Sequence, residues 1–219
     1  MEIIAHMRTD FPTKFGVPRQ SGLAHNLCRI EFCGVYRNPD AIRGIEGFSH
    51  LWVLWLFSEN KAHGFCATVR PPRLGGNTRM GVFATRSPYR PNDIGLSCVR
   101  LVKVMEDGSL LVEGADMTDG TPVIDIKPYL PFADSHPEAT GGFAEEVRGK
   151  ALSVVFPKEQ LSKIPQEKQK ILLDTLSQDP RPHYQKDASR IYGMPFCGMD
   201  VHFKVENDVL TVVEITNYS

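Results

Sequence analysis

An arginine-rich segment over residues 70–92 is the most unusual part of this sequence. It holds five arginines and no acidic residue, although the whole chain is balanced, with 25 Lys and Arg against 26 Asp and Glu. Arginine forks without a neighbouring carboxylate favour an anionic partner such as phosphate. Phe83 and Tyr89 lie in the same segment and are able to stack on nucleic-acid bases. The segment therefore predicts a site for a phosphate-bearing molecule, unless its arginines pair with acids elsewhere in the fold.

A second segment places three aspartates around a turn at residues 119–122. Asp-Gly-Thr-Pro is a turn sequence, and the residues after it favour an extended strand. Backbone groups of such a turn can hold an adenine or an amino-acid group. Asp116, Asp119 and Asp125 can accept hydrogen bonds from ribose hydroxyls or from an ammonium. The competing interpretation is a tight structural turn in which Asp119 bonds to its own backbone.

Two shorter segments carry polar groups that could also act on a ligand. The loop at residues 14–20 places Lys14, Arg19 and Gln20 close together after the first strand. Loops held by a rigid scaffold often carry function, although a solvated loop fits the same residues. His50 precedes an apolar run. A histidine at such a place is either catalytic or a structural residue whose hydrogen bonds are satisfied within the fold.

Several well-known signatures are missing from the sequence. No G-x-G-x-x-G follows a strand, and Gly149-Lys150 lacks both the upstream glycine and the Ser or Thr of a phosphate-binding loop. Neither G-x-S-x-G nor H-E-x-x-H occurs, which disfavours a hydrolase. The seven histidines are scattered without metal-ligand spacing. We therefore expect neither a dinucleotide-binding Rossmann fold nor a metal.

The composition indicates a cytoplasmic protein without a membrane segment. The N-terminus lacks the features of a signal peptide. The longest apolar run, residues 51–57, is too short to span a bilayer. The five cysteines are odd in number and none forms a C-x-x-C pair, which favours reduced thiols.

The elements that must position these segments are mostly strands. Residues 51–57 predict a central strand buried on both faces, and residues 80–85, 96–104 and 110–114 predict others. Glu106-Asp107-Gly108 favours a hairpin turn. A short helix is expected near residues 38–42, with Asn38 as its N-cap and Pro39 at the first helical position. Many short strands with few helices favour a β-barrel or a strongly curved sheet over residues 1–135.

The pattern changes after a linker at residues 136–149. Residues 154–156 predict a short strand, and Pro157 and Pro165 each open a helical stretch. Residues 199–206 alternate between apolar and polar side chains. Asn207-Asp208 then favours a two-residue turn into a last strand. Residues 150–219 therefore predict a small C-terminal α+β domain.

The combined motifs resemble those of the TsaA-like (TrmO, YaeB) family of tRNA methyltransferases. The motifs match those of the family closely, occur in the same order along the chain, and cover most of residues 1–135. They are KFGVPRQ (14–20), GFSHLW (47–52), RPPRLGGNTRMGVFATRSPYRPN (70–92), IGLS (94–97) and DGTPVIDIKPYLPFAD (119–134). DPRP at 179–182 and YGM at 192–194 are similar to the tail of bacterial members. One position differs, because Asp93 stands where the family commonly has proline.

The resemblance implies a mainly β fold, a single-sheet β-barrel unrelated to Rossmann methyltransferases, with a small C-terminal α+β domain. It also implies that S-adenosylmethionine is the methyl donor. The acceptor would be the exocyclic nitrogen of threonylcarbamoyladenosine, next to the anticodon of a threonine tRNA. The family further implies a homodimer.

Site residues are carried over from the same resemblance. The expected cofactor contacts are Pro18, Arg19, Gln20, His50, Leu51, Arg86, Leu96, Asp119, Gly120, Thr121 and Pro122. The expected tRNA contacts are Arg73, Arg79, Arg90 and Tyr89. Asp116, Asp119 and His50 are the candidates for a general base, and the sequence does not choose among them. The alternative function is a non-catalytic RNA-binding module with a degenerate cofactor site.

Overall fold

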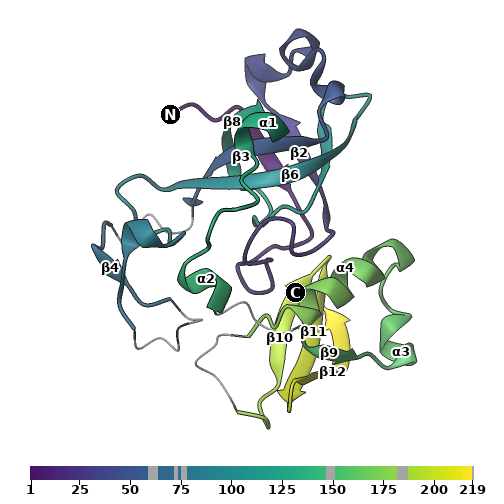
Figure 1. Ribbon diagram of the computed structural model, residues 1–219. Coiled ribbons are helices and arrows are strands. Elements are labelled where there is room, and N and C mark those ends of the chain that lie inside the picture. Colours follow the sequence, from purple (N-terminus) through teal and green to yellow (C-terminus); the bar gives the residue numbers. More distant parts are fainter. Residues whose placement is uncertain (59–63, 72–73, 75–77, 147–150, 182–186, 219) are drawn as a thin grey trace.

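The computed structural model describes residues 1–58, 64–71, 74, 78–146, 151–181 and 187–218. A closed barrel forms its upper part in Figure 1, and a four-stranded sheet with two helices lies below it. The arginine loop, which we define as residues 64–92, projects from the barrel on the side of β4 (Figure 1). The expected mainly β fold with a small C-terminal α+β part is confirmed.

The barrel is a single antiparallel sheet closed on itself. Its strands are β1 (Ala5–Arg8), β2 (Leu27–Phe32), β3 (His50–Leu56), β6 (Ile94–Val104), β7 (Leu110–Glu113) and β8 (Pro122–Pro128). They pair in the order β1-β2-β7-β6-β3-β8, with β8 returning to β1. Closure leaves no free sheet edge, so every strand is paired on both sides.

Strand β3 corrects one expectation from the sequence. Its run of apolar residues predicted burial on both faces, but the residues alternate between buried and half-buried. Leu51 and Val53 are fully buried and Trp55 is nearly so, whereas Trp52 and Leu54 lie on the other face. An antiparallel barrel strand presents one face to the interior, and loops and short helices cover the other only in part.

Short helical turns connect the strands. Three of them follow β2: η1 (Gly34–Tyr36), η2 (Pro39–Ile42) and η3 (Ile45–Gly47). The expected short helix is η2, and the Asn38 side chain caps it by accepting a 3.0 Å hydrogen bond from the Asp40 backbone amide. After β8 come α1 (Pro131–Asp134) and α2 (Phe143–Glu146), which the sequence interpretation missed.

The arginine loop contains less strand than expected. The strand predicted over residues 80–85 is limited to β5 (Met80–Gly81), which pairs with β4 (Thr68–Val69). The chain then turns into η6 (Val82–Ala84). The Arg90 guanidinium explains this turn, because it binds the carbonyl oxygens of Val82 and Thr85 and draws them together.

The C-terminal sheet packs helices against one face. Its elements are β9 (Ser153–Val155), α3 (Lys158–Leu161), α4 (Gln166–Ser177), β10 (Tyr192–Phe196), β11 (Met199–Glu206) and β12 (Val209–Asn217). The strand order is β10-β11-β12-β9, and only the β12–β9 pairing is parallel among the described strands. Asn207 and Asp208 have φ of 47° and 61°, which confirms the expected two-residue hairpin turn.

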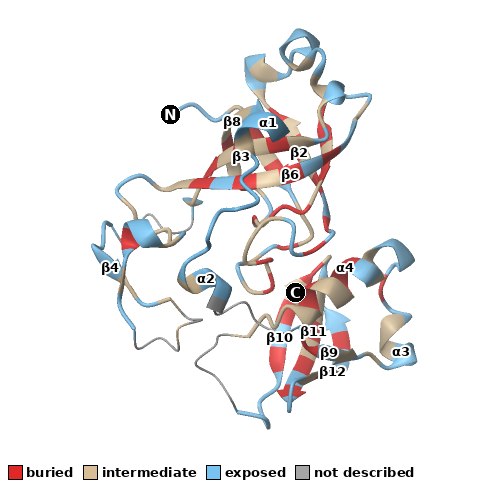
Figure 2. Cartoon of the chain, in the orientation of Figure 1, coloured by how far each residue is buried: buried red, intermediate tan, exposed pale blue. Residues whose placement is uncertain are grey.

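Two hydrophobic cores fill the barrel and the C-terminal sheet, as the buried residues in Figure 2 show. The second core also contains Phe11, which is fully buried although it lies in the N-terminal loop, residues 9–26. Asp10 in the same loop pairs with Lys168 of α4, and its carbonyl oxygen accepts a 2.9 Å hydrogen bond from the Cys197 amide. The N-terminal loop thus ties the barrel to the C-terminal sheet.

Candidate functional site

A pocket of about 280 Å³ lies where three of the segments singled out in the sequence meet the end of β3. We call it the loop pocket. Its walls come from the N-terminal loop, the end of β3, the arginine loop and the stretch before β8. The lining residues are Lys14, Val17, Trp55, Leu56, Phe57, Ser58, Pro88, Asp116, Met117, Thr118 and Thr121. Its lining is mostly apolar around one carboxylate, the usual character of a small-molecule site.

Asp116 is the carboxylate of the loop pocket. Its Oδ1 accepts a 2.5 Å hydrogen bond from the Ser97 hydroxyl, and Ser97 Oγ accepts a 2.9 Å hydrogen bond from Trp55 Nε1. Burial raises the pKa of Asp116, while the Ser97 hydrogen bond and the charge of Arg86 act in the opposite direction. A carboxylate with a raised pKa beside a pocket is suited to accept a proton near neutral pH.

Glycine at position 95 permits this arrangement. Gly95 of β6 lies opposite Trp55 of β3 in the ladder. A Cβ atom at position 95 would lie 2.2 Å from Trp55 Cε2, far inside contact distance. The indole therefore lies flat against the backbone of β6, where its Nε1 reaches Ser97.

A chain of polar contacts leads from the arginine loop to the C-terminal domain. Arg86 donates to Gln20 Oε1, and Gln20 Nε2 donates a 2.6 Å hydrogen bond to the Arg19 carbonyl oxygen. Arg19 Nη2 in turn donates to the carbonyl oxygens of Asp179 and Arg181, at 2.7 and 3.0 Å. The expected contact residues Arg19, Gln20 and Arg86 thus lie together.

The turn that receives Arg19 is itself held by an ion pair. Arg181 Nε lies 2.8 Å from Asp179 Oδ1, and both side chains are mostly buried. Burial acts to raise the pKa of Asp179, but the hydrogen bond and charge of Arg181 outweigh it, so the pKa is lowered. Asp179 has a φ of 53°, a left-handed conformation that the ion pair helps to hold.

Asp119 has structural contacts at the end of β1. Its Oδ1 accepts a 3.0 Å hydrogen bond from the Thr9 amide, and Arg8 lies 3.8 Å away. Gly120 donates its amide to the Met7 carbonyl oxygen. Of the turn at residues 119–122, only Thr121 lines the loop pocket.

Of the expected cofactor contacts, only Thr121 lines the loop pocket, and three of the others lie clearly away from it. His50 begins β3, and Leu56 at the other end lines the pocket, so about 20 Å of strand separates them. Leu51 is fully buried in the barrel core, and Leu96 is 53% exposed on the outside of β6. Within one chain, these residues do not join Asp116. His50 instead contacts Ser49 and the ring of Tyr129.

The arginines of the arginine loop do not pair with acids in the part of the chain that the structure describes. This holds for Arg70, Arg79, Arg86 and Arg90, whereas Arg73 lies outside the described residues. Arg79 and Arg86 are exposed, and Tyr89 is half-buried. Among the described residues, the loop therefore keeps most of the positive charge that its sequence indicated, and Arg86 also acts on Asp116 through its charge.

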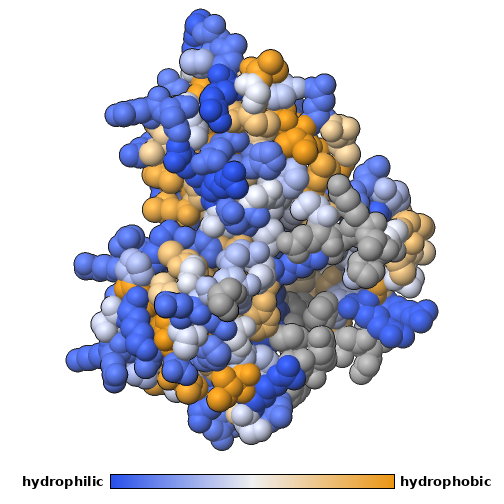
Figure 3. Space-filling model, turned by 180° about the vertical axis from the view of Figure 1, so that it is seen from behind, coloured by the Kyte–Doolittle hydropathy of each residue, from blue (hydrophilic) through white to orange (hydrophobic). Residues whose placement is uncertain are grey.

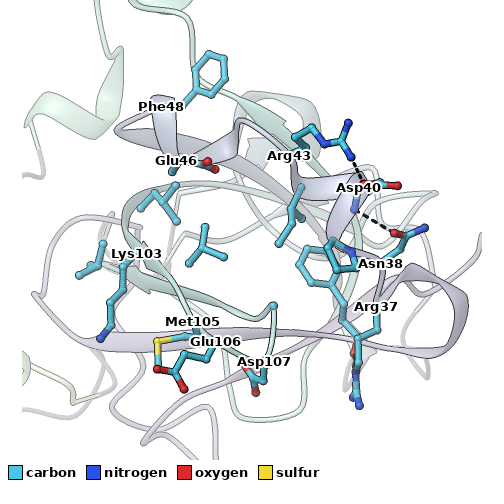
Figure 4. A pocket seen from close by; sticks show the side chains of 17 residues that line it. Arg37, Asn38, Asp40, Arg43, Glu46, Phe48, Lys103, Met105, Glu106 and Asp107 are labelled. Atoms are coloured by element: carbon cyan, nitrogen blue, oxygen red, sulfur yellow. Dashed lines mark hydrogen bonds and ion pairs between the residues drawn. The ribbon is translucent and has the colours of Figure 1, made fainter.

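A larger pocket lies elsewhere on the barrel and contains none of the expected site residues. It measures about 880 Å³ and lies between η1–η3 and the β6–β7 hairpin (Figure 4). Arg43 pairs with Asp40 there, and Arg37 donates to the Phe32 carbonyl oxygen. Despite its size, this pocket lacks a buried carboxylate, so we assign the chemistry to the loop pocket.

Sequence reasoning missed the residues that surround Asp116. Trp55 appeared only as part of an apolar strand, and Ser97 only as part of a motif. Ser97 is 1% exposed, so it is a buried hydroxyl in an otherwise apolar strand face. A lone serine at an inward-facing strand position is the signal that could have identified it.

The barrel, the loop pocket and the unpaired arginines define a small-molecule-binding β-barrel protein with an anion-binding loop. A family model described as the tRNA-methyltransferase O N-terminal domain matches residues 6–135, and the TrmO C-terminal domain model matches residues 149–218. The chain belongs to the tRNA-methyltransferase O family.

Individual relatives agree with this assignment. An Escherichia coli (strain K12) protein named tRNA (adenine(37)-N6)-methyltransferase is 43% identical over 93% of this chain and 92% of its own length. A Pseudomonas aeruginosa protein named putative S-adenosylmethionine-dependent methyltransferase RcsF is 38% identical over 97% of this chain and 95% of its own length. A crystal structure of TrmO from P. aeruginosa superposes with a TM-score of 0.81 at 32% identity, covering 99% of this chain and 95% of the other.

Two further observations concern membranes and metals. Among the described residues, no helix has the length and apolar character needed to cross a bilayer. Within the same residues, no cluster of three or more His, Cys, Asp or Glu side chains is placed to hold a metal ion.

Proposed function

We propose that this protein methylates the N6 nitrogen of adenosine 37 in tRNA with S-adenosylmethionine as the donor. The full-length relative from Escherichia coli carries that activity in its name. We further propose that the base is threonylcarbamoyladenosine, next to the anticodon of a threonine tRNA. The observation that carries the proposal is the buried Asp116 carboxylate in the loop pocket, beside a loop rich in unpaired arginines.

The loop pocket offers the groups that S-adenosylmethionine needs. Trp55, Phe57 and Met117 give apolar and aromatic walls, which suit an adenine ring and a cationic sulfur. The Lys14 ammonium lies at the same pocket and suits the carboxylate end of an amino acid, which leaves the Asp116 carboxylate for the acceptor nitrogen.

The reaction needs a proton acceptor, and it needs the methyl group to be aligned with the acceptor nitrogen. S-adenosylmethionine would supply a methyl group bonded to a positively charged sulfur, and the leaving group would be a neutral thioether. The carbamoylated adenosine nitrogen is a poor nucleophile while it holds its proton, so Asp116 removes that proton as the methyl group is transferred. Ser97 and Trp55 hold Asp116 in one orientation throughout. The apolar walls exclude water from the reacting atoms.

The alternative is a non-catalytic RNA-binding module with a degenerate cofactor site. Such a module needs the arginine loop but has no use for a buried carboxylate whose pKa is raised. Burial of an unpaired carboxylate lowers stability, so Asp116 is better explained by a catalytic role. The catalytic proposal therefore accounts for more of the structure.

We also propose that the enzyme acts in the cytoplasm as a homodimer. The support for a dimer is that His50 and Leu96 belong to the expected cofactor contacts but lie away from the loop pocket of their own chain. In addition, we propose a division into a barrel domain (residues 1–135), a linker (136–149) and a C-terminal domain (150–219).

Titration calorimetry with S-adenosylmethionine is the first test, followed by methyl transfer to purified tRNA. We expect one micromolar site per chain and methylation of threonine tRNA that carries the threonylcarbamoyl group. The same tRNA lacking that group is the matched control and should accept little methyl. Equal methylation of both tRNAs would contradict threonylcarbamoyladenosine as the substrate nucleoside. Binding of tRNA without methyl transfer would favour the RNA-binding module.

A further inference from the structure

We propose that Phe65 and Phe83 form a platform on which one unpaired base of the tRNA anticodon loop stacks. This inference rests on the proposed function, since it names how the same enzyme holds its RNA. The two rings stack on each other with an offset in the arginine loop, with centroids 6.3 Å apart and planes inclined by 26°. Phe65 is 56% exposed and Phe83 is 68% exposed. Two adjacent phenyl rings left in water indicate a partner that covers them.

Contacts within the arginine loop hold the platform in place. The Arg90 guanidinium lies 5.3 Å from the centre of the Phe83 ring. Arg90 Nη1 also donates to the carbonyl oxygens of Val82 and Thr85, at 3.1 and 2.8 Å. These contacts fix the turn that presents Phe83. A ring held in advance loses little conformational entropy when a base stacks on it.

The backbone fixes Phe65 in a similar way. The Cys66 amide donates to the Tyr89 carbonyl oxygen at 3.2 Å, and the Val82 amide donates to the Ala67 carbonyl oxygen at 3.0 Å. These bonds and the β4–β5 pairing join the two sides of the loop next to the rings. Both phenyl groups are therefore presented by a braced hairpin.

The charge around the platform selects RNA as its partner. Residues 60–92 contain no acidic residue, and Arg79 and Arg86 are exposed on the same loop. Figure 3 shows hydrophobic residues on this projecting lobe next to strongly hydrophilic ones. Aromatic rings among arginines are the usual surface for an unpaired nucleotide, whose base stacks while its phosphates meet the cations. A second copy of this chain would bring like charges together.

Two of the expected tRNA contacts also have contacts within the arginine loop itself. Arg90 uses its guanidinium to brace the turn and Phe83, so its contribution to RNA binding is mainly to position the ring. Tyr89 is half-buried and contributes its carbonyl oxygen to the brace. The exposed stacking groups are Phe65 and Phe83.

The test measures binding of an anticodon stem-loop RNA from threonine tRNA by fluorescence anisotropy at several salt concentrations. Phe83→Ala should weaken binding about tenfold, as expected for the loss of one base–aromatic stack. Phe83→Trp should restore it, because a larger ring also stacks. The slope of affinity against salt should not change, since no charge is removed. Phe132→Ala removes an 88% exposed phenylalanine from α1 and is the matched control.

A series of RNAs, each with one abasic position in the loop, then locates the base. The penalty of Phe83→Ala should vanish for one abasic position and persist for the others. Unchanged RNA affinity in Phe83→Ala overturns the proposal, as does an equal loss in Phe132→Ala. A simultaneous loss of S-adenosylmethionine binding, or conversion of a dimer to a monomer, also overturns it.

The proposed function fails separately. Wild-type protein that binds the stem-loop through Phe83 but transfers no methyl group to whole tRNA disproves the enzyme and leaves the platform intact. Methyl transfer with normal RNA binding by Phe83→Ala disproves only the platform. Absence of RNA binding by the wild type disproves both.

Discussion

Arg19 of the N-terminal loop donates a 2.7 Å hydrogen bond to the carbonyl oxygen of Asp179, which lies in the turn after α4 of the C-terminal domain. The same loop lines the loop pocket through Lys14 and Val17. The C-terminal domain therefore supports one wall of the loop pocket without lining it.

Arg181→Ala should weaken cofactor binding from a distance. Loss of the ion pair leaves Asp179 free to move, and the Arg19 anchor relaxes with it. We expect the KM for S-adenosylmethionine to rise about tenfold, the effect of losing roughly one charge-assisted hydrogen bond. The kcat at saturating cofactor should change little. Arg190→Ala, which removes an arginine that lies over the Tyr192 ring, is the control, and an identical rise in that variant would contradict the interpretation.

Asp116→Asn should abolish most activity. Removal of a general base typically lowers the rate by about 10²–10⁴-fold. The kcat of the wild type should rise with pH through the raised pKa of Asp116 and then level off, because only the ionised carboxylate accepts a proton. Asp116→Glu is the informative comparison. Full activity in Asp116→Asn, with a similar pH profile, would exclude Asp116 as the base.

The Asp116→Asn variant should also be more stable than the wild type at about pH 8. Burial raises the pKa of Asp116, so this group binds more protons in the folded state than in the unfolded state. Wild-type stability therefore falls as pH rises from the ordinary carboxyl pKa, about 3.9, through the raised value. An Asn side chain does not ionise in this range, so Asp116→Asn does not lose stability in this way. Thermal melts should show the Tm difference shrinking toward acid pH, and a constant difference would contradict this account.

Gly95→Ala should damage both stability and catalysis. The new methyl group would displace the Trp55 indole and break its hydrogen bond to Ser97. We expect a loss of about 3 kcal/mol in the free energy of unfolding, the upper part of the range for overpacked cores. Denaturant melts and kcat measure the two effects. Gly81→Ala is the control, since a Cβ there meets nothing within 4 Å.

Arg79→Glu should weaken tRNA binding about tenfold or more and reduce its salt dependence, while leaving S-adenosylmethionine binding intact. Arg79 is exposed and has no acidic partner among the described residues. Arg43→Glu reverses an exposed arginine that pairs with Asp40 on the larger pocket and serves as control. A parallel loss of cofactor binding in Arg79→Glu would assign the residue to the fold or to the cofactor site.

Much of the fold was predictable because it depends on local rules. Alternation, turn residues and prolines identified most strands, the hairpin at Asn207-Asp208 and the helices after Pro157 and Pro165. The sequence pattern did not predict β2, β4, β10, α1 or α2, and two other errors depend on tertiary structure. Whether β3 is covered on its second face depends on loops distant in sequence, and the strand expected at residues 80–85 ends where Arg90 captures two carbonyl groups.

The site was predictable as segments and less so as contacts. The N-terminal loop, the arginine loop and the stretch before β8 do meet at one pocket. Asp116 and Asp119 could not be separated by sequence, because both are aspartates near one turn. Only the barrel shows that Asp116 is buried beside Ser97, whereas Asp119 binds the Thr9 amide.

The position of Phe11 has a consequence for how the enzyme matures on the ribosome. All the strands of the barrel lie before residue 129 in the chain. Phe11, in contrast, packs in a core whose other residues come from later elements such as α4 and β10. The N-terminal loop, although made first, is therefore among the last segments to settle. A chain that ends after the barrel would thus leave Phe11 without the core that it enters in the whole protein.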